Sequence, residues 1–273
     1  MIGLKLGVST MPFIKSNFDE IVKTIENTPE NLKLDCWEII EEGFHFLNPE
    51  RIKMLKNAAS TSKISYTVHA PFAGINLASP EPLQSVLLDF MDKSLERSYT
   101  LEAEIFIVHP GLLSPFTIHF PELAWESLKN AIRHLCKLSD ALGSPKIAVE
   151  NMAPPYPFLV SQSQDIERLF RELEDCEFGL CLDIGHAQKS GGVKTFLKHV
   201  EQYVTHVHAH DNIGDKDTHL QVGKGIVDWK YVVSTLKKLN FRGYIVVENT
   251  TLDDAYDSIH FLKKLLTARS SRY

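Results

Sequence analysis

Short apolar runs alternate with longer segments of helical periodicity along the chain, and this alternation is the feature that most limits its possible folds. The apolar runs cover residues 4–8, 34–40, 64–68, 105–108, 146–149, 178–182, 204–207 and 244–247. Between and after them we expect helices at residues 18–27, 49–59, 81–100, 120–142, 163–174, 192–202, 228–239 and 252–267. Eight strands that alternate with eight helices predict a parallel sheet with right-handed crossovers, and eight strands close such a sheet into a (β/α)8 barrel.

The spacing of the strand ends supports a single domain. From Ser9 to Glu248 they recur about every 34 residues, close to the roughly 30 or more residues that one strand–helix unit needs. No segment rich in glycine, serine or proline divides the chain, and 273 residues with 44% hydrophobic content are normal for one TIM barrel. We therefore expect residues 1–273 to form one α/β domain, a (β/α)8 TIM barrel.

The charge and the cysteines exclude several classes of protein. A net charge of −6 argues against a strongly basic nucleic-acid-binding protein, although a local basic patch is invisible in the total. The four cysteines form no CxxC pair, which indicates free thiols in a reducing compartment. No apolar run approaches the roughly 18 residues of a membrane helix, and the first residues lack the features of a signal peptide. We expect a cytoplasmic protein without a membrane partner, and its oligomeric state stays open.

Seven of the eight expected strands end in an acidic residue or a histidine. The residues at the strand ends are Ser9, Glu38, His69, His109, Glu150, Asp183, His208 and Glu248. In (β/α)8 barrels the carboxyl ends of the strands surround the mouth of the active site, so these side chains should meet there. Carboxylates and imidazoles that converge at one mouth indicate a metal centre built from several strands.

The stretch from His206 to His219 is the strongest candidate for a wall of this site. Its first residues alternate, so that His206, His208 and His210 share one face of a strand end, and Asp217 and His219 follow from the loop beyond. These residue types are ligands of zinc and of other divalent transition metals. Whether His208 or His210 contacts the ion depends on the register of the strand end, and an ordinary solvated loop is the alternative for Asp217 and His219.

Two further histidines follow apolar runs. His69 precedes Ala-Pro-Phe72 and His109 precedes Pro-Gly, and the turns that these prolines fix favour both histidines as ligands rather than as ordinary buried residues. Glu38 closes a third run. It could bind substrate hydroxyls or pair with a neighbouring cation.

Glu150 and Glu248 each follow an apolar run and precede an asparagine, so that two Glu-Asn pairs should face each other across the mouth. An unpaired carboxylate is costly to bury, which favours metal binding over the alternative of salt bridges at the rim. Asp183 ends another run, and Gly185 permits a sharp turn that returns His186 to the mouth. Alternatively, Asp183 is only the N-cap of a helical turn.

These residues lie in recognisable motifs. In chain order they are His-Ala-Pro-Phe at 69–72, Ile-Asn-Leu-Ala-Ser at 75–79, Val-His-Pro-Gly at 108–111, Val-Glu-Asn at 149–151, Leu-Asp-Ile-Gly-His at 182–186, His-Val-His-Ala-His-Asp at 206–211, Asp-Thr-His at 217–219, Gly-Lys-Gly at 223–225 and Val-Glu-Asn at 247–249. With them the chain resembles, over essentially its whole length, the xylose isomerase-like TIM-barrel superfamily. That superfamily includes sugar phosphate isomerases and epimerases and the endonuclease IV family, so the motifs do not specify one reaction.

Resemblance to the sugar isomerase and epimerase branch implies one divalent metal ion, Mn²⁺, Zn²⁺, Co²⁺ or Mg²⁺. Its ligands would be Glu150, Asp183, His208 and Glu248. The ion would polarise the carbonyl and the adjacent hydroxyl of a ketose and so stabilise an enediolate. Glu150 and Glu248 would act from opposite faces of the substrate, one removing a proton and the other returning it, while His186 would hold a substrate hydroxyl. The partner would be a small carbohydrate, with further substrate-binding candidates at Glu38, Phe72, His69 and His109.

Resemblance to the endonuclease IV branch implies instead three zinc ions, with DNA as the partner. The three ligand sets would be His69, His109 and Glu150; Glu150, Asp183, His208 and Glu248; and His186, Asp217 and His219. A metal-bound hydroxide would attack the phosphodiester at an abasic site, and Phe72 occupies the place of an aromatic residue that inserts into the DNA.

Two motifs depart from the nuclease branch. Residues 183–186 are Asp-Ile-Gly-His rather than Asp-Thr-Cys-His, and residues 208–211 are His-Ala-His-Asp rather than His-Leu-Asn-Asp. We therefore predict a divalent-metal-dependent sugar isomerase or epimerase, with a zinc-dependent AP endonuclease as the alternative. Another metal-dependent lyase or hydrolase, or a non-catalytic metal-binding protein, would fit the same residues less well.

Overall fold

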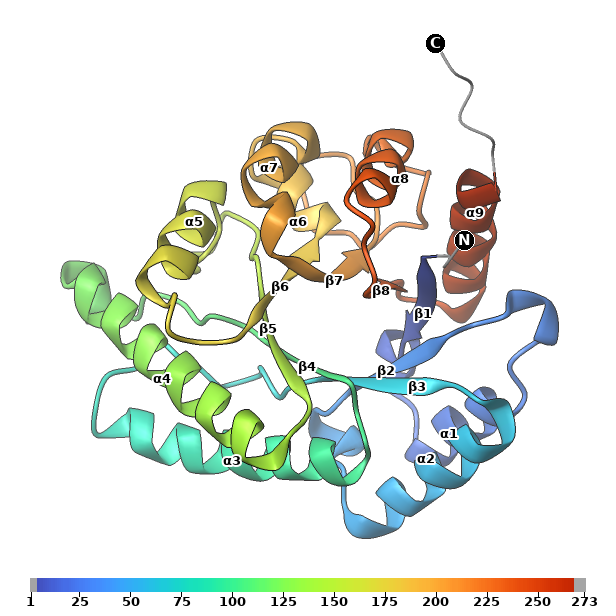
Figure 1. Ribbon diagram of the computed structural model, residues 1–273, viewed down its shortest axis with the longest axis horizontal. Coiled ribbons are helices and arrows are strands. Elements are labelled where there is room, and N and C mark those ends of the chain that lie inside the picture. Colours follow the sequence, from blue (N-terminus) through green and yellow to red (C-terminus); the bar gives the residue numbers. More distant parts are fainter. Residues whose placement is uncertain (1–3, 268–273) are drawn as a thin grey trace.

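The computed structural model describes residues 4–267 and contains a closed barrel of eight parallel strands (Figure 1). The strands are β1 (Lys5–Ser9), β2 (Cys36–Ile40), β3 (Ser65–His69), β4 (Ile105–Val108), β5 (Lys146–Glu150), β6 (Gly179–Asp183), β7 (Val204–Ala209) and β8 (Tyr244–Val247). Each strand pairs in parallel with its neighbours in the sequence, and β8 pairs with β1 to close the barrel. The predicted TIM barrel is confirmed. The outermost parts of the expected 1–273 domain, residues 1–3 and 268–273, lie outside the described residues.

The strands are apolar along most of their length because they are buried on both faces. Every residue of β2 and of β6 is buried, which is typical of a parallel sheet covered by helices. Inside the barrel, the side chains of Ile107, Tyr244 and Val246 form part of a separate apolar cluster. Gly7 faces this packed interior, since a Cβ atom there would lie 2.2 Å from Sγ of Cys36. The barrel is therefore a core rather than a pore, and a ligand site must lie at one of its ends.

Nine α-helices within the described residues surround the barrel (Figure 1). They are α1 (Phe18–Glu26), α2 (Pro49–Ser62), α3 (Leu83–Thr100), α4 (Pro121–Leu142), α5 (Ser163–Glu172), α6 (Ile184–Lys189), α7 (Val193–Val200), α8 (Trp229–Lys238) and α9 (Leu252–Thr267). Asn17, Asn48 and Asp228 cap α1, α2 and α8, because each side chain accepts a hydrogen bond from a backbone N–H of the first turn. The eight predicted helices are all present, with ends that differ by a few residues.

Short 3₁₀ helices interrupt the loops. They are η1 (Met11–Phe13), η2 (Glu30–Leu32), η3 (Gly43–His45), η4 (Thr117–His119) and η5 (Glu201–Tyr203). Within residues 4–267, no helix combines the length and the apolar character that a membrane crossing requires. All four cysteines are free thiols, as expected from their spacing.

Helix α6 is the element that the sequence analysis missed. The sequence predicted a sharp turn at Gly185, but Gly185 lies within α6 and has no positive φ. Asp183 caps this helix, because its Oδ1 accepts the backbone N–H of His186 at 2.7 Å. Asp183 is therefore an N-cap, as the alternative interpretation expected, but it is not only an N-cap. Its other carboxylate oxygen faces His210 in the polar cluster.

Candidate metal centre

The acidic residues and histidines of the strand ends gather around a cavity of about 610 Å³ at the carboxyl end of the barrel. The acidic residues and histidines that line it come from strand ends and from the segments beyond them: His69, His109, Glu150, His186, Asp215, Asp217, His219 and Glu248. Asp183 and His208 are completely buried and do not line the cavity. The volume lies in the range of sites that bind small molecules. A larger hollow of about 1030 Å³ at the opposite end of the barrel has no histidine in its lining, so the candidate chemistry belongs to the carboxyl end.

His208 lies at the centre of the cluster. Its Nδ1 atom is 3.5 Å from Oε1 of Glu150 on β5 and 3.5 Å from Oε2 of Glu248, which directly follows β8. This Nδ1 is buried and has no hydrogen-bond partner. Of the two histidines that the sequence left open, His208 is thus the one that faces the pair of glutamates.

His69 and His109 approach Glu150 from the other side. Each Nε2 atom lies 3.3 Å from Oε2 of Glu150. Nδ1 of His69 contacts the carbonyl of Ala70 at 3.0 Å, which fixes the orientation of this ring. Phe72 packs against both imidazoles, with ring centroids 5.2 Å from His69 and 4.9 Å from His109. The two histidines and Phe72 therefore form one wall of the cavity.

His186, Asp217 and His219 form a second group at the rim. Oδ2 of Asp217 lies 3.0 Å from Nε2 of His186 and 3.4 Å from Nε2 of His219. The Nδ1 atoms of both rings face backbone carbonyls, at 2.8 Å from Asn151 and 2.9 Å from Glu248. Because each Nδ1–H donates to a carbonyl, Nε2 is the nitrogen that faces Asp217 in both rings, and it becomes a potential ligand atom when it gives up its proton.

His210 is fully buried and belongs to the second group more than to the first. Its Nε2 lies 3.1 Å from Oδ2 of Asp183 and 3.7 Å from Oδ1 of Asp217, and its ring stacks on His219 with centroids 3.9 Å apart. The ring can approach α6 this closely because Gly185 has no side chain. The sequence offered no signal for this contact beyond the glycine itself.

Glu38 occupies a different place from the one expected. It lies in the middle of β2 rather than at its end, is completely buried and does not line the cavity. The structure therefore does not place Glu38 where it could contact a substrate, because two more residues of β2 separate it from the mouth. Its carboxylate instead faces two imidazoles, with Oε2 2.9 Å from Nε2 of His206 and Oε1 3.0 Å from Nε2 of His208. Pairing with a neighbouring cation was the alternative that the sequence left open.

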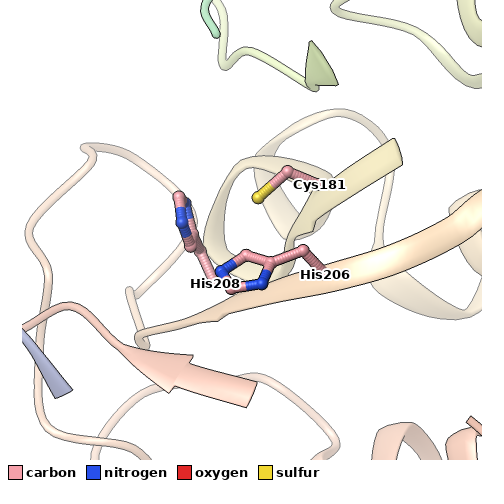
Figure 2. Close-up of side chains that lie close together, drawn as sticks. All are labelled: Cys181, His206 and His208. Atoms are coloured by element: carbon pink, nitrogen blue, oxygen red, sulfur yellow. The ribbon is translucent and has the colours of Figure 1, made fainter. Parts of the chain in front are cut away.

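A further group of side chains consists of Cys181, His206 and His208, and Figure 2 shows the thiol of Cys181 pointing toward the two histidines. Potential ligand atoms of these three side chains lie within 4.8 Å of one another. None of the three is exposed. Cys181 also belongs to the apolar cluster inside the barrel, so this layer of three side chains adjoins that interior.

The loop that carries Asp217 and His219 is anchored by Asp211. The buried carboxylate of Asp211 accepts hydrogen bonds from the backbone N–H groups of Gly223 and Val227 and from Nε1 of Trp229, at 2.9, 3.2 and 2.9 Å. These contacts tie both ends of the 211–229 segment together and so hold the rim group in place.

The two asparagines of the Glu-Asn pairs support the site from behind. The side chain of Asn151 exchanges hydrogen bonds with the backbone of Asp183, and the side chain of Asn249 donates to the carbonyls of His219 and Leu220. The repeated Asn in the sequence was the available signal for this role, which the sequence analysis did not assign.

The two central glutamates differ in their affinity for protons in the metal-free protein. Burial raises the pKa of Glu248, and the nearby charge of Glu150 adds to this increase. Burial also opposes ionisation of Glu150, but His208 and His109 hold the pKa of that carboxyl well below its usual range. Burial alone would lower the pKa of His208, yet the surrounding acidic groups raise it well above its usual value. Two carboxyls with separated proton affinities are the arrangement that acid–base chemistry requires.

The residues present fit a divalent cation. A buried imidazole nitrogen without a partner faces two carboxylate oxygens, and carboxylate oxygen with imidazole nitrogen is a donor set of zinc and manganese sites. Further groups of potential ligand atoms within 4.8 Å of one another are His69–His109–Glu150, Asp183–His186–His210, His210–Asp217–His219 and Glu38–His208–Glu248. The predicted metal residues are thus brought together at one mouth.

Comparison with known proteins agrees with this fold. Residues 30–265 match the family model described as xylose isomerase-like TIM barrel. The uncharacterised protein MJ1614 of Methanocaldococcus jannaschii is 30% identical over 266 residues, which cover 96% of this chain and all of the relative. The crystal structure of a D-tagatose 3-epimerase-like protein superimposes with a TM-score of 0.88 at 28% identity, over 96% of this chain and 97% of the other. A probable endonuclease 4 of Mesomycoplasma hyopneumoniae is 25% identical over 231 residues, 80% of this chain and 74% of the relative. The chain belongs to the xylose isomerase-like TIM-barrel family.

Proposed function

We propose that the protein is a divalent-metal-dependent epimerase or isomerase of ketose sugars. The observation that carries this proposal is the pair of buried carboxylates, Glu150 and Glu248, which converge on Nδ1 of His208 from two different strands. Proton removal and return at one carbon needs two such groups on opposite sides of the substrate. The similarity to a D-tagatose 3-epimerase-like structure supports the same reaction class.

The proposed metal site consists of Glu150, Asp183, His208 and Glu248. A divalent cation bound there would polarise the carbonyl and an adjacent hydroxyl of the sugar and thereby make the neighbouring C–H more acidic. We do not assign the ion, because Mn²⁺, Co²⁺, Mg²⁺ and Zn²⁺ all accept oxygen and nitrogen ligands of this kind.

The remaining residues bind and orient the substrate in this proposal. One of the two glutamates removes the proton from the carbon next to the carbonyl, and the other returns a proton to the opposite face. His186 at the rim would hold a sugar hydroxyl, while Phe72 and Tyr156 would supply apolar walls for the carbon face of the sugar, since all three line the cavity. Lys189 and Lys216 also line the cavity and would favour an anionic substituent such as a phosphate on the substrate.

The first test is a screen of five- and six-carbon ketoses, with and without a terminal phosphate, for metal-dependent formation of epimers or of the isomeric aldose. Glu150→Gln and Glu248→Gln should each reduce turnover at least about 100-fold, since general acid–base catalysis contributes roughly 10²–10⁴. Glu96→Gln removes an exposed carboxylate on α3 and is the matched control, with unchanged turnover expected. Full activity in either glutamate variant of the site would refute the paired-carboxylate mechanism.

A zinc-dependent AP endonuclease is the second candidate, because the rim group of His186, Asp217 and His219 supplies a further set of ligands and an endonuclease 4 is among the relatives. Elemental analysis of protein purified without chelator separates the two. About one ion per chain supports the epimerase, and about three zinc ions support the nuclease. Cleavage of an abasic-site oligonucleotide by protein that leaves every ketose unchanged would replace our proposal.

A further inference from the structure

Glu38 holds a buried carboxylate directly beneath the proposed metal site, in a position that the proposed reaction does not use. Its Oε2 atom accepts hydrogen bonds from Nε2 of His206 and from Oγ1 of Thr67, both at 2.9 Å. Its Oε1 atom lies 3.0 Å from Nε2 of His208. All four side chains are completely buried, so water does not compete for these contacts.

The ion-pair distance between Oε1 of Glu38 and Nε2 of His208 favours a proton on Nε2, although the two atoms do not meet the geometry of a hydrogen bond and neither has another hydrogen-bond partner. A carboxylate oxygen 3.0 Å from Nε2 is favourable only if Nε2 is protonated, because two lone pairs at this distance would repel each other. With the proton on Nε2, the Nδ1 atom of the neutral ring has a free lone pair. That atom is the one that faces Glu150 and Glu248, each at 3.5 Å.

The orientation of the carboxylate is itself fixed. His206 and Thr67 both donate to Oε2, and they come from different strands, β7 and β3. Oε1 is thereby left for His208 alone. In known metal sites, a carboxylate that accepts the second N–H of a ligating histidine orients the ring and makes it a better ligand.

We propose that Glu38 is a positioning residue that keeps the ring proton of His208 on Nε2 and so presents Nδ1 to the metal ion. The role of the ion rests on the function proposed above, whereas the protonation pattern can be measured without any substrate. Glu38 touches neither substrate nor reacting atoms and acts only through His208.

Glu38→Gln tests this role with almost no change in volume. A glutamine side chain has one acceptor oxygen, which should stay on the side of His206 and Thr67, because the reverse orientation requires both of these groups to become acceptors. Its amide N–H then points at Nε2 of His208 and can be accommodated only if the ring proton moves to Nδ1. A proton on Nδ1 occupies the lone pair that the metal needs.

The measurement is the binding of Zn²⁺ and Co²⁺ to wild-type protein and to Glu38→Gln, combined with ¹H–¹⁵N spectra of histidine-labelled, zinc-loaded protein. We expect zinc on Nδ1 of His208 and a proton on Nε2 in the wild type, and an affinity about 10- to 100-fold lower in the variant. The matched control is Thr67→Val, which removes one donor to Glu38 but keeps the carboxylate, so the proton should remain on Nε2 of His208. A packing role alone would leave the metal affinity of Glu38→Gln unchanged.

Three results would overturn the proposal: zinc on Nε2 of His208, equal affinities of the two proteins, or a thiolate-to-cobalt band, which would put the ion in the layer of Cys181. If Glu38→Gln does not fold, the spectra of the wild type and of Thr67→Val still decide where the proton lies. Absence of activity on every ketose would refute the proposed function without affecting this protonation pattern. The two proposals can therefore fail separately.

Discussion

Gly185→Ala is a sensitive test of how tightly the second group of polar residues is packed. A Cβ atom at position 185 would lie 2.0 Å from Cε1 of His210 and 2.5 Å from its Nδ1. The ring cannot easily move away, because its Nε2 contacts Asp183 at 3.1 Å and its face stacks on His219. The new methyl group must therefore displace buried atoms.

Two opposing effects set the size of the change. Overpacking of a buried site costs about 1–3 kcal/mol. Alanine is favoured over glycine in a helix by up to about 1 kcal/mol, and this gain is smaller in α6, which has only six residues. We expect a net decrease of about 1–2 kcal/mol in the free energy of unfolding. In a His210→Ala background the clash is gone, so the same substitution should be neutral or slightly stabilising.

The assay is denaturant unfolding of four metal-free proteins: the wild type, both single variants and the double variant. Their double-mutant cycle should give a coupling energy of about 1–3 kcal/mol. Gly192→Ala is the matched control, because Gly192 has a φ of +98° and a Cβ atom there would meet no other atom within 4 Å. Its loss of folding free energy comes from the backbone conformation and should simply add to that of His210→Ala. Additive effects of Gly185→Ala and His210→Ala, within about 0.5 kcal/mol, would refute the close contact between α6 and His210.

Three further predictions concern the loop, the pH dependence and the metal. Asp211→Asn leaves at least one of its donors, the backbone N–H groups of Gly223 and Val227 and the indole N–H of Trp229, without an acceptor. We therefore expect a loss of about 2–3 kcal/mol in the free energy of unfolding and faster hydrogen exchange of these N–H groups, and unchanged exchange would contradict the anchoring role. Burial opposes the charge of His219, but its hydrogen bond to Asp217 raises the pKa of this imidazole from 6.5 to about 9. The metal-free protein should therefore lose the stabilisation from this group as the pH rises from 6.5 to about 9, and a gain in the free energy of unfolding over this range would refute the assignment. A divalent ion at 100 times its dissociation constant should stabilise the protein by about 2.7 kcal/mol. The measurement is an increase in Tm that a chelator reverses, and an unchanged Tm would contradict the metal site.

The fold could be predicted from the sequence because the strands of a parallel barrel are short, apolar and regularly spaced. All eight apolar runs coincide with strands, and polar residues that directly follow such runs, like His69 and Glu150, do lie at the mouth. Helix α6 could not be predicted in the same way. It has only six residues, and a glycine at its second position suggests a turn.

The errors in the candidate site come from register and from side-chain contacts. Glu38 was assigned to a strand end, although Ile39 and Ile40 continue the apolar run and carry β2 two residues further. That continuation was the signal for a place inside the barrel. The choice between His208 and His210 could not be made from alternation, because both share the same parity on β7 and on the residue after it. Only the three-dimensional contacts with Glu248 and with Asp183 distinguish them.

The most direct test of the central claim is exchange of solvent hydrogen into the substrate. Candidate ketoses are incubated in D₂O with protein that has been stripped of metal and then reloaded with Mn²⁺, Co²⁺, Mg²⁺ or Zn²⁺, and the products are analysed by NMR. We predict deuterium at the carbon next to the carbonyl, dependent on the added ion and absent in Glu150→Gln and Glu248→Gln. Conversion of a ketose without incorporation of deuterium, or exchange that persists in both glutamate variants, would contradict proton transfer by this pair.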